Sequence, residues 1–139
     1  MATISGIWTS PARNSGRMDG HERITAVADH GLEGCAHARP GGKRQVLFAS
    51  GEHLDSVGVE PGRIRENFTV AGEDVQEWPV GQRVRVGTAV FEITMVCDPC
   101  ERMDAIRPGL RGELEGKRGM LARVVEQGEV TLGDSVELT

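Results

Sequence analysis

The three cysteines of the chain and one of its histidines are the residues whose types and spacing best suggest chemistry. Cys35 and His37 are two residues apart in GLEGCAHARP, where glycines and a proline predict a loop. Cys97 and Cys100 form a C-x-x-C pair in MVCDPCERM. Sulfur and imidazole ligands suit zinc. If the loop and the pair meet in the fold, Cys35, His37, Cys97 and Cys100 are therefore candidates for one metal site.

The C-x-x-C pair has other interpretations, which the sequence leaves open. It can close a reversible disulfide, or it can hold one working thiol beside a supporting one. Cys97 ends an apolar strand and suits a buried core position equally well. Cys100 differs, because Asp98 as N-cap and Pro99 as first helical residue predict a helix start here. Free N–H groups at a helix start favour a thiolate, so Cys100 is the expected catalytic nucleophile or metal ligand, with Cys35 and His37 completing the site.

Arginines near apolar strands form a second unusual feature. Arg44 precedes QVLF, Arg65 precedes ENFTV, and Arg123 lies within LARVV. A buried charge without a partner is costly, and arginine binds phosphate in a bidentate manner. These three side chains are therefore expected to bind an anionic ligand, and internal salt bridges are the alternative for each of them.

Length and composition limit the classes of function. The 139 residues are enough for one domain, 1–139, with a real core. A net charge of −5 and an aromatic content of 4 % argue against nucleic acid as a partner. No apolar run approaches the length of a membrane span, and the first residues do not resemble a secretion signal. An odd number of cysteines argues against a disulfide framework. We therefore expect a cytoplasmic protein without a membrane partner.

Short alternating apolar runs between glycines predict a mostly β fold. The expected strands cover residues 3–9, 22–29, 44–49, 65–70 and 119–126, with hairpins around Gly87-Thr88 and Gly133-Asp134. A short helix is expected after Ser50 and another after Asp98. Many short strands with glycine-rich turns indicate a closed barrel or a sandwich.

Several of these segments together resemble a stand-alone MOSC domain, the C-terminal domain of molybdenum-cofactor sulfurases. GLEGCAHARPGGKRQVLF, GRIRENFTV, GQRVRVGTAVFEIT, DPCERM and RGMLARVVEQGEVTLGDSVEL occur in that family's order and spacing. The resemblance is clearest over residues 31–138, and residues 1–30 resemble the opening strands. It implies a MOSC-type β-barrel with a few short helices.

The resemblance also implies roles for individual residues. The cysteine after the proline of DPC, Cys100, would be the functional thiol, which in larger relatives handles sulfur or ligates molybdenum in a pterin cofactor. Some relatives reduce N-hydroxylated compounds with that cofactor. Arg65 and Asn67 of RENFTV and Arg44 of KRQV would help to hold an anionic ligand.

One departure from the family changes the expected chemistry. Cys35 stands where many members have aspartate, and this softens the ligand set. The leading hypothesis is therefore a zinc-dependent enzyme of sulfur chemistry that cleaves C–S bonds or transfers sulfur on an anionic or sulfur-containing small molecule. A molybdenum-cofactor protein, which would need a separate redox partner, and a non-enzymatic binding module are the alternatives. A homodimer is a further expectation, with GLRGELEGK as a contact or as a cover for the site.

Overall fold

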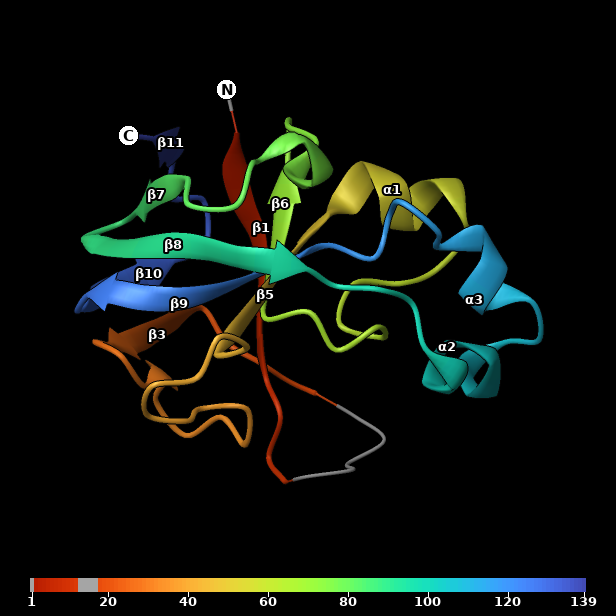
Figure 1. Cartoon of the computed structure of the whole chain (residues 1–139), viewed down its shortest axis with the longest axis horizontal. Coiled ribbons are helices and arrows are strands. Elements are labelled where there is room, and N and C mark those ends of the chain that lie inside the picture. Colours follow the sequence, from red (N-terminus) through yellow and green to blue (C-terminus); the bar gives the residue numbers. More distant parts are fainter. Residues whose placement is uncertain (1, 13–17) are drawn as a thin grey trace.

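The computed structural model describes residues 2–12 and 18–139, and these form a mostly β protein. The strands are β1 (Thr3–Thr9), β2 (Asp19–Gly20), β3 (Arg23–Val27), β4 (Gly31–Leu32), β5 (Val46–Ser50), β6 (Phe68–Ala71), β7 (Arg83–Val86), β8 (Ala89–Val96), β9 (Met120–Glu126), β10 (Gly128–Thr131) and β11 (Val136–Leu138). Eight of them form one sheet in the order β11-β7-β8-β9-β5-β6-β1-β2, which curls strongly into a half-barrel (Figure 1). A smaller sheet has the order β10-β3-β4. The expected mostly β, barrel-like fold is confirmed.

The main core lies on the concave face of the curled sheet and has aromatic residues at its centre. Phe48 on β5 packs against Phe68 on β6, Phe91 on β8 and Trp78, with ring centroids 5.2 to 5.6 Å apart. Tilted and edge-on ring pairs at such distances are favourable beyond the area that they bury. These contacts join strands that are distant in sequence, so the core holds β5, β6 and β8 in fixed relative positions.

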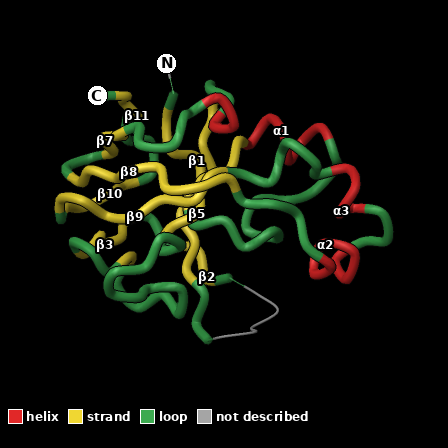
Figure 2. Tube along the Cα trace, in the orientation of Figure 1, coloured by secondary structure: helices red, strands yellow, loops and turns green. Residues whose placement is uncertain are grey.

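Three short helices stand together at one side of the sheet (Figure 2). They are α1 (Gly51–Ser56), α2 (Glu101–Ile106) and α3 (Leu110–Glu113), and a 3₁₀ turn, η1, covers Val75–Glu77. A second apolar cluster, which includes Leu54, Met103 and Leu110, joins the three helices. None of the helices in the described ranges has the length and apolar character needed to cross a membrane.

The hairpin prediction is confirmed at one site and wrong at the other. β7 and β8 pair across Gly87-Thr88 as expected. Around Gly133-Asp134 the turn forms, because the Asp134 N–H donates to the Thr131 carbonyl. However, β10 pairs with β3 and β11 pairs with β7, so the chain passes from one sheet to the other at this turn. The alternating pattern identified both strands, but it carries no information about distant pairing partners.

Candidate functional site

A cavity of about 280 Å³ lies where the sheet meets the helices. Leu47 on β5 and Leu121 on β9 are paired across the sheet and help to form its floor. Side chains alternate between the faces of a strand, and the neighbours of Leu47, Val46 and Phe48, belong to the main core. The cavity therefore opens on the face of the sheet opposite to that core. We call it the inner pocket.

The C-x-x-C pair lies at the inner pocket, with one thiol buried and one exposed. Cys97 follows β8, and its N–H donates to the Gly119 carbonyl over 3.0 Å. Burial raises the pKa of the Cys97 thiol, against the opposing positive charge of Arg118. Cys100 is exposed and also lines the pocket.

The helix after the pair begins later than the sequence predicts. Cys100 itself is the N-cap of α2, in extended conformation and without a side-chain capping bond, and the first helical residue is Glu101. The prediction of Asp98 as the cap is therefore wrong. A residue that precedes proline is biased toward extended backbone, which keeps Asp98 out of a helix start before Pro99.

Arg118 is the most unusual side chain of the inner pocket. It precedes β9, is only 7 % exposed, and lines the cavity. Its Nε and Nη1 atoms have no hydrogen-bond partner among the described residues. A buried N–H group without a partner costs about 1–3 kcal/mol, and more when it is charged. This arrangement suits a site in which an anion supplies the missing acceptors.

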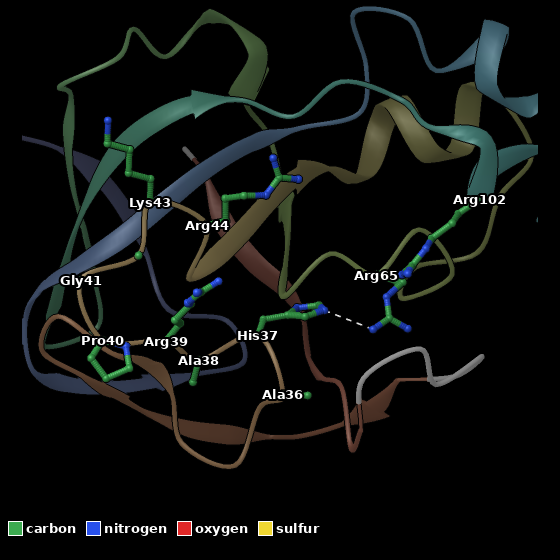
Figure 3. A pocket seen from close by; sticks show the side chains of 11 residues that line it. Ala36, His37, Ala38, Arg39, Pro40, Gly41, Lys43, Arg44, Arg65 and Arg102 are labelled. Carbon is green, nitrogen blue, oxygen red and sulfur yellow. Dashed lines mark hydrogen bonds between the residues drawn. The ribbon is translucent and has the colours of Figure 1, made fainter.

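Arg65 and His37 both line the inner pocket and are joined by a hydrogen bond, which is the dashed line in Figure 3. Arg65 has a φ of 67°, which is uncommon for a residue other than glycine. Its Nη2 donates to Ser10 Oγ over 2.9 Å and lies 3.2 Å from His37 Nε2. A guanidinium can only donate, so His37 Nε2 accepts and the imidazole is neutral. Burial, followed by the charge of Arg65, lowers the pKa of His37, which agrees with this assignment.

Cys35 does not line the inner pocket but is part of the main core, at 6 % exposure. Its Sγ lies 3.4 Å from the Ser10 N–H group and 3.5 Å from Asn67 Nδ2, both of which donate to it. Among residues 2–12 and 18–139, no three His, Cys, Asp or Glu side chains are grouped closely enough to hold a metal ion. The structure therefore brings His37, Cys97 and Cys100 to one cavity, but not Cys35.

Asn67 lines the inner pocket and also fixes its walls. Its Oδ1 accepts from the Leu47 N–H over 2.9 Å, and its Nδ2 donates to the Trp8 carbonyl over 3.0 Å. The side chain is buried. Asn67 is thus positioned to hold β5 and β1 beside the pocket.

The arginines divide into two groups. Arg44 and Arg102 line the inner pocket together with Arg65 and Arg118, and no aspartate or glutamate is among the described residues that line it. Arg123 instead lies in an ion pair, with its Nε 2.9 Å from Glu92 Oε1, and lines a separate cavity. For Arg123 the structure thus has the internal salt bridge that the sequence left as the alternative.

Sequence reasoning did not identify Arg118 or Arg102 as site residues. One available signal is that Arg118 precedes an apolar strand, in RGMLARVV, much as Arg44 precedes QVLF. Arg102 lies two residues after the exposed cysteine. Their approach to Arg44 and Arg65 depends on how β9 and α2 pack, which no local pattern encodes.

Solved structures share this fold. The chain is similar to the YuaD protein from Bacillus subtilis, at 19 % identity and a TM-score of 0.84, over 99 % of this chain and 96 % of that one. It is also similar to YiiM from Geobacillus stearothermophilus, at 18 % identity and a TM-score of 0.79, over 100 % of this chain and 75 % of that one. YiiM from Escherichia coli gives 19 % identity and a TM-score of 0.78, over 100 % of this chain and 70 % of that one.

No curated protein sequence matches the chain. The family model of the MOSC domain does match it, over residues 36–137. That range begins just before His37 and includes Cys97, Cys100 and all four arginines of the inner pocket. This chain belongs to the MOSC-domain family.

Proposed function

We propose that this MOSC-domain protein carries out sulfur chemistry on an anionic small molecule bound in the inner pocket. One observation carries the proposal: the exposed Cys100 lines the same small cavity as Arg118, whose buried Nε and Nη1 have no hydrogen-bond partner within the described part of the chain. The arginines would bind the anionic group, since guanidinium matches phosphate or carboxylate oxygens. Cys100 would act on sulfur at the mouth of the cavity.

The roles of the other residues follow from their contacts. His37 is neutral, the form that can accept a proton, and its Nε2 accepts from Arg65. For His37 Nε2 to take the proton of Cys100, Arg65 must stop donating its hydrogen bond to that nitrogen. An anion bound in the pocket would attract the Arg65 guanidinium away from His37. Cys97 is buried with a raised pKa and would act as a supporting thiol.

Sulfur transfer is the reaction that this arrangement supports best. The Cys100 thiolate would attack the outer sulfur of a persulfide donor. The donor's S–S bond would break, and the donor would leave as a thiolate while Cys100 becomes a persulfide. Positive charge from the arginines would stabilise the persulfide anion that forms on Cys100. C–S bond cleavage at the same thiol is the related reaction.

The molybdenum-pterin cofactor is a second candidate, because the family is associated with molybdenum-cofactor chemistry. The residues present fit such a group: Arg118 Nε and Nη1, which no described residue accepts from, could donate to a phosphate, and a cysteine thiolate is a soft metal ligand. When bound, the cofactor would supply redox chemistry at molybdenum. The chain's own residues would anchor its phosphate through Arg118, Arg65 and Arg44, and would place Cys100 beside it.

The zinc version of the proposal has less support. It needs Cys35 as a ligand, and this thiol accepts hydrogen bonds within the core. We therefore place the reaction at Cys100 without requiring zinc. Elemental analysis of the purified protein and of Cys35→Ala tests the metal separately: a full equivalent of zinc that the substitution removes would restore the zinc version.

The experiment that tests the proposal is uptake of sulfane sulfur. The purified protein is incubated with glutathione persulfide and desalted, and the bound sulfur is released with cyanide and measured as thiocyanate. We expect stoichiometric uptake by the native protein and by Cys97→Ser, and none by Cys100→Ser. Equal uptake by Cys100→Ser and the native protein would contradict the proposal.

A further inference from the structure

A second, larger cavity is continuous in its lining with the inner pocket. It has a volume of about 970 Å³ and shares His37, Arg44, Arg65 and Arg102 with the inner pocket. Arg39 and Lys43, both exposed on the loop that leads to β5, line this second cavity but not the inner pocket. We call it the outer groove. Figure 3 shows its cationic side chains arranged from Lys43 at one end to Arg102 at the other.

The side chains that line the inner pocket and the outer groove carry strong positive charge. Six of the chain's 16 Lys and Arg residues line the two cavities, and the described residues that line them include no aspartate or glutamate. The chain as a whole carries a net charge of −5. A protein that is acidic overall therefore concentrates cations in one cleft, which raises the local concentration of anions there.

The two cavities differ in size and in burial. The inner pocket is smaller than the usual range for a small-molecule site, about 300–1,000 Å³, whereas the outer groove lies near the upper end of that range. Arg118, whose Nε and Nη1 lack partners among residues 2–12 and 18–139, lines the inner pocket and not the outer groove. The inner pocket thus suits a single anionic group, and the outer groove suits the rest of a larger molecule.

We propose that the ligand of this site carries at least two anionic groups, of the class of a polyphosphate or nucleoside diphosphate. One group occupies the inner pocket on Arg118, and the other lies in the outer groove against Arg39 and Lys43. The shared Arg44, Arg65 and Arg102 bridge the two positions. This inference rests on the proposed function, since it takes an anion in the inner pocket beside Cys100 as given.

Binding of a length series of inorganic anions tests the inference. Phosphate, pyrophosphate and tripolyphosphate are titrated into the protein by calorimetry at one fixed ionic strength, which holds general screening constant. Two double variants remove the same charge at different places. Arg39→Ala with Lys43→Ala removes the two cationic side chains that line the outer groove but not the inner pocket. Arg83→Ala with Arg85→Ala removes two exposed cationic side chains of β7 that line neither cavity.

We expect tripolyphosphate to bind the native protein at least about tenfold more tightly than phosphate, because the second anchored group binds at high effective concentration. The outer-groove variant should lose most of that gain and keep its phosphate affinity, and the β7 variant should resemble the native protein. Equal affinity across the series, or an equal loss in both double variants, would overturn the inference and leave the proposed function standing. If no member of the series binds, the inference and the proposed anion site fail together.

Discussion

Replacing Arg118 by methionine should stabilise the free protein and weaken anion binding. Methionine keeps much of the side-chain length without the charge. In the native protein Arg118 is 7 % exposed, and its Nε and Nη1 have no hydrogen-bond partner among the described residues. The substitution removes both buried donors. Replacement of a buried ion pair by apolar residues is often neutral or stabilising, by about 1–4 kcal/mol, and removal of buried donors that lack acceptors should have the same sign.

The buried carboxyl group of Glu66 should reduce the stability gained by Arg118→Met. The carboxyl group is buried, and its Oε1 lacks a partner among the described residues. Burial raises the pKa of Glu66, and the positive charge of Arg118 acts in the opposite direction by favouring the carboxylate. Without Arg118 the carboxylate loses that support. The cleaner comparison therefore uses the Glu66→Gln background, in which we expect Arg118→Met to raise the free energy of unfolding by about 1–3 kcal/mol.

The effect on binding has the opposite sign. A hydrogen bond to a charged group contributes about 1.5–3 kcal/mol, so loss of Arg118 should weaken phosphate binding by about ten- to a hundredfold. Urea unfolding without phosphate measures the first effect, and calorimetry with phosphate measures the second. Arg111→Met, at an exposed arginine on α3 outside both cavities, is the matched control. A destabilised Arg118→Met protein in both backgrounds, with unchanged phosphate affinity, would refute the reasoning and make Arg118 a structural residue.

Three further predictions follow from the same contacts. The His37 imidazole should titrate below its ordinary pKa of 6.5 by NMR, and phosphate should raise that pKa by neutralising the nearby arginines; a titration unaffected by phosphate would be inconsistent with an anion in the pocket. Folding lowers the pKa of His37, so the native state binds fewer protons than the unfolded state and loses stability as the pH falls below about 6.5. His37→Gln should reduce this loss, measured by urea unfolding at a series of pH values. The same dependence of the free energy of unfolding on pH in both proteins would count against a neutral His37. Burial raises the pKa of Glu66 above 4.5, so the native state binds more protons than the unfolded state, and the protein should lose stability as the pH rises from 4.5 through the folded pKa. Glu66→Gln should abolish this loss. An unchanged slope of the free energy of unfolding against pH in the variant would show that the carboxyl group does not titrate as its burial requires.

Local patterns were enough for most of the fold. Alternation in QRVRVGTAVFEITMV predicted the β7–β8 pair, and the strand at residues 3–9 matches β1, Thr3–Thr9. The pairings of β10 with β3 and of β11 with β7 could not be predicted, because they depend on how distant strands meet when the sheet curls. The helix start at α2 was misplaced by two residues, because the influence of Pro99 on Asp98 outweighed the capping pattern.

The site could be predicted only in part, for related reasons. Cysteine spacing and the arginines before strands indicated Cys100, Cys97, Arg44 and Arg65, and the structure brings all four to the inner pocket. The position of Cys35 in the core could not be read from its polar neighbours in sequence. The burial of Arg118 Nε and Nη1 without partners among the described residues is a result of packing, so the sequence alone could not identify Arg118 as a site residue.

The most direct test of an anion site beside a reactive thiol is the rate of alkylation of Cys100 by iodoacetamide, a neutral reagent, as phosphate is added. Peptide mass spectrometry follows Cys100 and uses the buried Cys97 and Cys35 as internal references. We expect phosphate to slow alkylation of Cys100 in a saturable way, and Arg118→Met to shift saturation to higher phosphate concentration. A rate of Cys100 alkylation that stays constant as phosphate is raised in the native protein would contradict an anion site beside this thiol.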